Sequence, residues 1–129
     1  MKYFGLTLCL QNDAQKIAAY REHHRAVWPA VLERLRACGV HHMRIFLRDR
    51  HMFMYIETDD TFDPAVDFAR INEDPVSAEW NALMATLQER APEATPEEWW
   101  AVMEPVFDLA SQLRSVRDLT ATGPGGHDS

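Results

Sequence analysis

Glycine and cysteine are scarce in this sequence, and each shortage excludes a class of site. Three of the five glycines lie in the last seven residues, so no glycine-rich loop is available to hold a nucleotide phosphate. The two cysteines, Cys9 and Cys38, and the six histidines lack the paired-cysteine or His-Glu-x-x-His spacing of a zinc site. We therefore expect no metal and no cofactor.

Long apolar runs and an excess of basic residues are also absent. The chain begins directly in Tyr3-Phe4-Gly5-Leu6 without a charged and apolar leader, which predicts a reduced, cytoplasmic protein. Twenty acidic against 13 basic residues give a formal charge of -7, which argues against a nucleic-acid partner and against an anionic membrane. The negative charge does not argue against a small-molecule ligand.

Composition predicts one domain followed by a tail. A hydrophobic fraction of 47% over 129 residues is enough for a single core. We expect a single α+β domain over residues 1–109. The tail, residues 110–129, ends in Gly123-Pro124-Gly125-Gly126 and is predicted to be partly disordered.

The predicted elements alternate in a way that defines a fold class. Apolar residues at every second position from Phe4 to Leu10 predict a first strand. A helix follows over 13–38, which is expected to kink or restart at Pro29 and is ended by Gly39. The remaining elements are a hairpin of strands 40–48 and 52–58, helices 63–72 and 75–90, and a last strand 103–109. This order predicts a ferredoxin-like split βαβ sheet with its helices on one face.

The other face of that sheet is predicted to carry apolar side chains. Strand alternation places five residues there: Tyr3, Thr7, Phe46, Phe53 and Tyr55. Because so apolar a patch is unfavourable in water, we expect a homodimer that pairs sheet against sheet.

The helix over 13–38 carries the best candidate for chemistry. Tyr20, His24 and Trp28 follow one another at four-residue spacing, so a phenol and an imidazole share one inward face. His23 is expected to point outward. An imidazole suits proton transfer near neutral pH, and the aromatic rings suit a sugar. The simpler interpretation is a buried histidine that is hydrogen-bonded and has no chemical role.

The tryptophans add aromatic surface to this site. Trp80 lies in a predicted helix after Asp74-Pro75, from which its indole could cover the pocket mouth. Trp99 and Trp100 follow a proline-containing loop and are expected either in the pocket or at the dimer interface. Each of the three also fits ordinary core packing.

These residues together resemble the L-rhamnose mutarotase family, which includes L-fucose mutarotases. The resemblance covers about residues 2–109 and rests on dispersed motifs: Tyr20-x-x-x-His24, Val27-Trp28-Pro29, Gly39, Ile45-Phe46-Leu47, Phe53-x-Tyr55-x-Glu57, Trp80, Met84 and Met103-x-x-Val106-Phe107. It implies a dimeric α+β barrel of ferredoxin-like subunits. It also implies cofactor-free interconversion of the α and β anomers of a 6-deoxy-L-sugar, a monosaccharide.

The resemblance assigns roles to particular residues. The family's proton-donor histidine corresponds to His24, and its sugar-binding tyrosine to Tyr20. Met43 stands where the family has a second tyrosine, and Trp80-Asn81 stands where it has a Trp-Trp pair. These two departures favour L-fucose over L-rhamnose, with Trp99 as a further residue against the sugar ring.

Two points stay open at the level of sequence. The group that works beside His24 is unassigned, and a carboxylate such as Asp108 or a water held by Tyr20 would serve. The alternative function is a dimeric α/β-barrel binding module or small oxygenase that holds an aromatic or haem-like ligand, because its apolar pocket would use the same aromatic residues.

Overall fold

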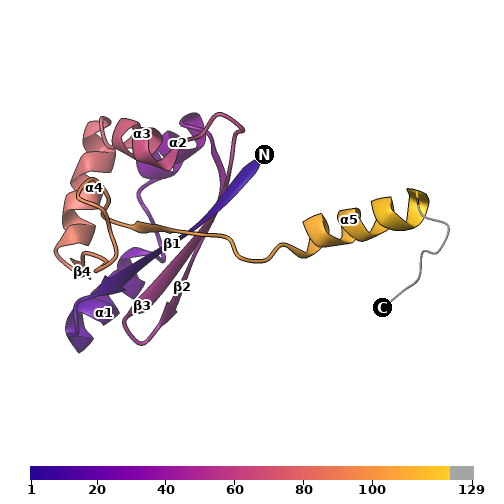
Figure 1. Cartoon of the computed structure of the whole chain (residues 1–129). Helices are drawn as coiled ribbons and strands as arrows, with labels where there is room; N and C mark the ends of the chain where they lie inside the picture. Colours follow the sequence, from indigo (N-terminus) through magenta and orange to yellow (C-terminus); the bar gives the residue numbers. More distant parts are fainter. Residues whose placement is uncertain (123–129) are drawn as a thin grey trace.

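A computed structural model describes residues 1–122 and shows one antiparallel sheet (Figure 1). Its strands are β1 (Lys2–Leu10), β2 (Val40–Arg48), β3 (His51–Thr58), β4 (Gln88–Glu89) and β5 (Ala101–Met103). They lie in the order β2-β3-β1-β4, and β5 also pairs with β1. This is the ferredoxin-like order, so the predicted α+β fold class is confirmed.

The helical stretch predicted over 13–38 restarts at Pro29, so it forms two helices. α1 (Ala14–His23) begins at Asp13, whose carboxylate accepts from the backbone N–H groups of Gln15 and Lys16. α2 (Pro29–Ala37) restarts at Pro29, since proline fits the first helical position, where no backbone donor is needed. Gly39, at φ +97°, follows its end.

Two further helices begin as the sequence predicts. α3 (Pro64–Ile71) and α4 (Pro75–Ala85) each have proline in the first turn and an aspartate cap. Asp63 accepts from the Ala65 N–H group, and Asp74 accepts from that of Ser77. α4 ends before the predicted residue 90 because the chain straightens there into β4, which the sequence analysis did not predict.

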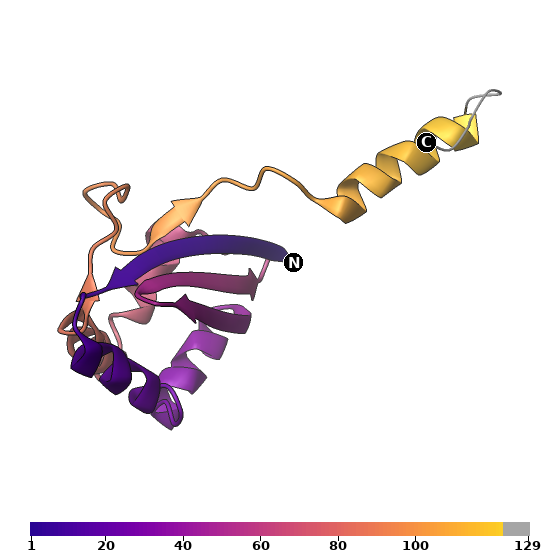
Figure 2. The ribbon, with the colours of Figure 1, turned by 90° about the horizontal axis from the view of Figure 1, so that it is seen from below.

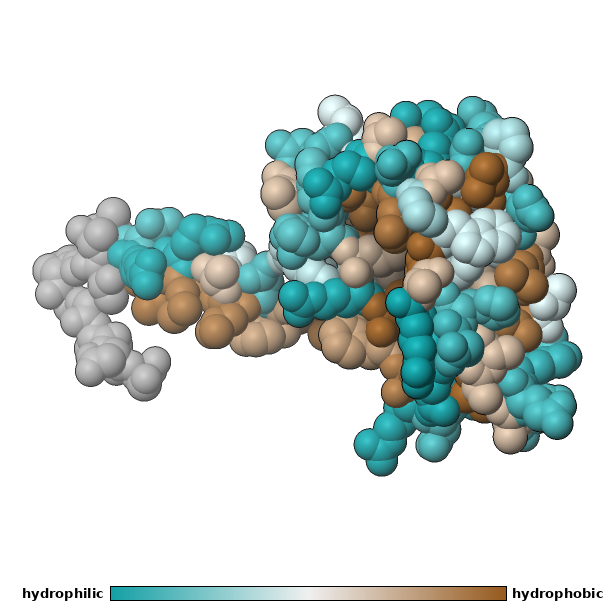
Figure 3. All heavy atoms as spheres, turned by 180° about the vertical axis from the view of Figure 1, so that it is seen from behind, coloured by the Kyte–Doolittle hydropathy of each residue, from teal (hydrophilic) through white to brown (hydrophobic). Residues whose placement is uncertain are grey.

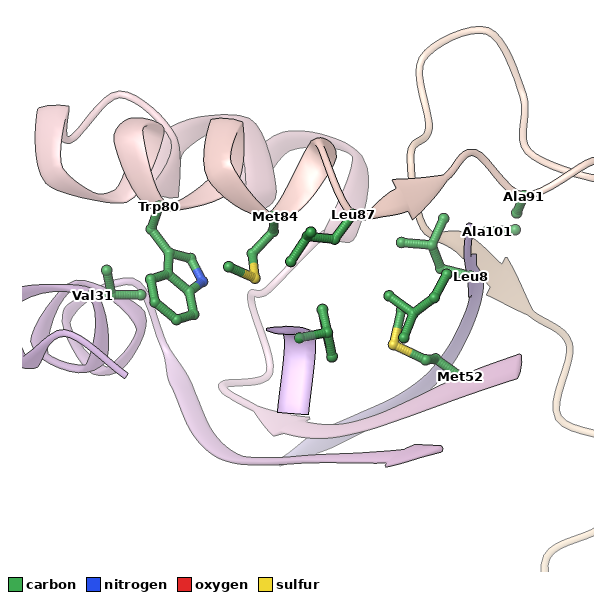
Figure 4. Packing of buried hydrophobic residues seen from close by; sticks show 10 residues of the cluster. Leu8, Val31, Met52, Trp80, Met84, Leu87, Ala91 and Ala101 are labelled. Carbon is green, nitrogen blue, oxygen red and sulfur yellow. The ribbon is translucent and has the colours of Figure 1, made fainter. Parts of the chain in front are cut away.

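The four helices α1 to α4 cover a single face of the sheet (Figure 2). The inward residues of β1 are buried in the alternating pattern the sequence predicts. In Figure 4, Trp80 and Met84 extend from α4 into the space between the helices and the sheet, with Trp80 beside Val31 of α2, while Leu8 and Met52 come from the sheet; all five belong to one buried cluster. The core therefore lies between the helix layer and the sheet.

The opposite face of the sheet is open in the single chain. Tyr3, Phe46 and Phe53 are 51%, 55% and 39% exposed, and the Phe46 and Phe53 rings stack 6.2 Å apart. The structure thus places these side chains on the face that the alternation predicted.

The C-terminal part differs from the prediction. The last strand is β5 rather than 103–109, and a helix, α5 (Leu109–Thr122), begins at the end of the predicted domain and extends into the tail, whose partial disorder stays a prediction. Residues 123–129 of the tail lie outside the described residues. The helix stands away from the domain (Figures 1 and 2), with apolar atoms along one side (Figure 3), including the exposed Leu109, Leu113 and Val116. A domain that ends at residue 109 stays a prediction.

Within residues 1–122, no helix has the length and apolar character needed to cross a bilayer.

Candidate active site

A cavity of about 1330 Å³ lies between the helix layer and the sheet. Its size exceeds the roughly 300–1,000 Å³ of ordinary ligand pockets, because it extends along much of the space between the two layers. All six residues singled out from the sequence line it: Tyr20, His24, Met43, Trp80, Asn81 and Trp99. The predicted residues thus share one enclosed space.

His24 is held at the end of α1 by the residue one turn before it. Its Nδ1 lies 2.9 Å from the Tyr20 carbonyl oxygen, and its ring stacks on the Tyr20 ring at a centroid distance of 4.0 Å. A carbonyl only accepts, so Nδ1 carries the proton of the neutral imidazole and Nε2 keeps the lone pair. The neutral ring can therefore accept a proton at Nε2.

The surroundings of His24 favour this neutral form. Burial lowers its pKa below the ordinary value of 6.5, and repulsion from His23 lowers it further, while the bond to the Tyr20 carbonyl opposes both. Since burial is the largest of these influences, most His24 side chains are uncharged at neutral pH. A proton acceptor is thus available before substrate arrives.

Trp80 forms the wall beside His24. The His24 ring is 5.4 Å from the Trp80 ring and tilted at 66°, and Trp28 meets Trp80 edge-on at 5.1 Å. Trp28 supports the other rings but is not among the residues that line the cavity. The expected outward direction of His23 is wrong: at the last position of α1 its side chain is half-buried, and its ring lies 6.2 Å from the Trp80 ring.

Replacing His23 with asparagine is expected to move the acid limb of the pH–activity profile to higher pH. The change removes the repulsion that lowers the pKa of His24, so His24 becomes protonated, and loses its base, at a higher pH. Activity in alkaline buffer should stay near that of the unchanged protein. Measuring kcat/KM against pH checks this; an acid limb that stays in place or moves down would contradict it.

Tyr20 is buried and lies beside Gln88, a residue that the sequence analysis missed. Burial raises the pKa of the Tyr20 phenol to about 12, and a hydrogen bond with the Gln88 side chain partly offsets this. Gln88 also accepts a hydrogen bond of 2.8 Å from the Trp99 indole N–H group. No periodic pattern marks Gln88, since β4 has two residues.

An ordered loop carries Trp99 and Trp100 to the cavity. The Glu98 carboxylate accepts from the backbone N–H groups of Thr95 and Val102, at 3.0 and 3.1 Å, and these bonds lower its pKa. Arg90 donates to the Glu98 carbonyl at 2.9 Å. Both tryptophans line the cavity in this chain, and a place at a dimer interface stays a prediction.

The remaining candidates differ in how they meet the cavity. Met43 is half-buried on the inward face of β2, as strand parity predicts. Asn81 is exposed and donates to the Asn72 side-chain oxygen at 2.9 Å. Asp108 does not line the cavity: it accepts from the Tyr3 hydroxyl and from the Ser111 N–H group at the start of α5. Asp108 is therefore not in place to assist His24 of its own chain.

Among the described residues, no group of three or more histidine, cysteine, aspartate or glutamate side chains is placed to hold a metal ion.

Fold and cavity together define an α+β barrel-type subunit with a small-molecule site between helices and sheet. The L-rhamnose mutarotase family model matches residues 3–109, and the chain belongs to that family, one of isomerases acting on a monosaccharide. The resemblance seen in the sequence is thereby confirmed.

Individual relatives agree with this assignment. A UPF0734 protein of Dictyostelium discoideum is 39% identical over 112 residues, covering 84% of this chain and 90% of that protein. An L-rhamnose mutarotase of Burkholderia cenocepacia is 36% identical over 93 residues, covering 70% and 83%.

Two solved structures share the fold. An L-rhamnose mutarotase from Formosa agariphila superposes with a TM-score of 0.63 at 20% identity, covering 84% of this chain and 99% of that one. Tetracenomycin F2 cyclase from Streptomyces glaucescens, a type-II polyketide cyclase, gives 0.52 at 18% identity, covering 84% and 96%. At these identities the likeness concerns the fold alone.

Proposed function

We propose that this protein is a mutarotase that interconverts the α and β anomers of a 6-deoxy-L-sugar. The observation that carries the proposal is His24, a neutral imidazole with an available Nε2 in an aromatic cavity of a mutarotase-family fold. Mutarotation needs a base and an acid at neighbouring oxygens of one sugar ring, and an imidazole serves as either.

His24 acts first as the base in this proposal. Its lowered pKa supplies the neutral form, which takes the proton of the anomeric hydroxyl while the ring oxygen gains a proton and its bond to the anomeric carbon breaks. The open aldehyde rotates, and the hydroxyl formed from the ring oxygen attacks its other face and returns its proton to the group that supplied it, while His24 gives its proton to the new anomeric oxygen. The sequence-based hypothesis had His24 as the acid at the opening step, and the direction of its pKa favours the reverse order.

Tyr20 serves as a hydrogen-bond donor rather than as the base. With a pKa of about 12 its phenol stays protonated at neutral pH, so it can bind a sugar oxygen or hold the water that supplies the second proton. Positioned proton transfer contributes about 10²- to 10⁴-fold, and orientation of the ring adds to it. These two effects are enough for a reaction that already proceeds in water.

Saturation-transfer NMR on the anomeric protons tests the proposal directly. With a chelator present and no added metal, exchange of L-fucose or L-rhamnose anomers should be faster than in buffer alone. Exchange no faster than buffer for both sugars would refute the function. The alternative of a binding module or small oxygenase predicts instead a protein that takes up a coloured aromatic or haem-like ligand, visible by absorbance.

The preferred sugar is a finer part of the proposal, and we favour L-fucose. The Met43 thioether offers no hydroxyl donor to the cavity, and the Asn81 amide is engaged with Asn72. A lost hydrogen bond to a substrate hydroxyl costs up to about 10⁴-fold in sites built to make that bond, so a sugar that needs donors at these two positions is disfavoured. Relatives carry the name of L-rhamnose, so exchange rates of both sugars at equal concentration decide; faster L-rhamnose exchange would overturn the preference but keep the reaction.

We further propose that two copies pair through their open sheet faces, in the cytoplasm. The support is the exposed aromatic patch of Tyr3, Phe46 and Phe53, an unfavourable surface for a lone chain in water. Cys9 and Cys38 are free thiols, as expected in a reducing compartment.

Phe46→Arg is expected to convert the dimer to a monomer, because it places a charge in the middle of the paired aromatic faces. Val66→Arg is the matched control: Val66 is 60% exposed, on α3, away from this face. Sedimentation velocity measures both variants. A monomeric unchanged protein, or a Phe46→Arg variant that remains dimeric, would contradict the pairing.

A further inference from the structure

Gln88 is a buried amide fixed at the wall of the cavity. It is 7% exposed, and β4 pairs its backbone with Leu10 of β1. The Gln11 side chain also donates to the Gln88 carbonyl at 3.3 Å. With its backbone anchored in this way, the Gln88 side chain has few directions open to it, and its polar atoms need partners where they lie.

The Trp99 indole settles which end of that amide faces which neighbour. An indole N–H group only donates, so the atom 2.8 Å from it is the Gln88 carbonyl oxygen, Oε1. The amide NH₂ group is then turned away from the indole, and the Tyr20 phenol lines the same cavity; Gln88 lowers the pKa of that phenol, which is the effect of a donor. The NH₂ group donates, and the phenol oxygen accepts.

We propose that Gln88 is a positioning residue of the sugar site, which turns the Tyr20 hydroxyl into a donor directed at substrate and seats Trp99 against the cavity. This inference rests on the proposed mutarotase function. Because Gln88 occupies a lone pair of the phenol oxygen, the phenol proton stays free for a ring oxygen or hydroxyl of the sugar. Burial keeps that proton on Tyr20, whose pKa is raised to about 12.

The direction of these bonds makes the proposal testable by a change of one atom. In Gln88→Glu the carboxylate still accepts a hydrogen bond from the Trp99 indole. It cannot donate to Tyr20, and instead it accepts a hydrogen bond from the Tyr20 hydroxyl group. The shape of the side chain is kept, and the donor available to substrate is lost. Gln88→Met, which is similar in size, loses both bonds.

In alkaline buffer, where the introduced carboxyl is ionised, Gln88→Glu should lower kcat about 10-fold while KM changes by less than about 3-fold. Tyr20→Phe should lower kcat to a similar degree. The double variant should be no slower than Tyr20→Phe alone, since both changes remove the same donor. Wild-type kcat in Gln88→Glu, or losses that multiply in the double variant, would overturn the proposal.

A second measurement needs no sugar. The indole N–H resonance of Trp99, assigned with Trp99→Phe, should stay in place in Gln88→Glu and move towards the solvent-exposed position in Gln88→Met. An unmoved resonance in Gln88→Met would refute the seating of Trp99. If the unchanged protein showed no anomer exchange, the proposed function would fail by itself, and the indole resonance would still decide whether Gln88 holds Trp99.

Discussion

Replacing His24 with asparagine is expected to slow anomer exchange by about 10²- to 10⁴-fold, the range that positioned proton transfer contributes. The asparagine amide can still donate to the Tyr20 carbonyl as Nδ1 does, so the end of α1 keeps its hydrogen bond. What disappears is Nε2, the atom that accepts the anomeric proton. Saturation-transfer NMR measures the rate, and circular dichroism checks the fold.

His23→Asn is the matched control, since it makes the same change one position earlier, in a side chain that packs near Trp80 but does not line the cavity. In alkaline buffer it should exchange anomers at nearly the unchanged rate. Equal losses in both variants would mean that the histidines act through the packing of α1 and not through proton transfer at His24.

Trp80→Ala is expected to lower the free energy of unfolding by about 3–5 kcal/mol, the usual cost of removing a large buried aromatic side chain. Trp80 is 6% exposed and joins α4 to the ends of α1 and α2 through His24 and Trp28. Its loss should also free the His24 ring and reduce anomer exchange. Urea-induced unfolding, followed by circular dichroism, gives the stability.

Trp99→Ala provides the comparison for Trp80. Trp99 is 40% exposed, and its one polar contact is the bond to Gln88, so its removal should cost much less stability than that of Trp80. A loss below about 1 kcal/mol in Trp80→Ala, or equal losses in the two variants, would contradict the central place of Trp80 in the packing.

The long-range order of elements was predictable because each long element carries its own signal. The alternation from Phe4 to Leu10 marks β1, and Asp63-Pro64 and Asp74-Pro75 mark the starts of α3 and α4. Pro29 marks the start of α2 in the same way, and the restart is the one of the two expected outcomes that the structure shows. The two-residue strand β4 has no local signal, since only its pairing with β1 makes it a strand.

The same contrast holds for the candidate site: residues with a local sequence signal were predicted, and residues placed only by tertiary packing were not. His24 was found because a histidine interrupts an apolar stripe, and helix spacing placed Tyr20 beside it. The half-buried position of His23, at the last residue of α1, is decided by tertiary packing. Gln88 became visible only in three dimensions, because its partners, Tyr20 and Trp99, come from α1 and from the loop before β5.

The position of β1 in the sheet also bears on how the protein is made. β2 and β3 are joined by a tight turn, so they can pair soon after they leave the ribosome, whereas β1 finds β4 and β5 only when distant segments have been synthesised. The loop with Trp99 therefore docks after these elements, and a nascent chain that has reached the end of α4 contains His24 and Trp80 but not yet Trp99 or Trp100. Hydrogen exchange should show this order in the finished protein, with β5 amides opening before those of β3.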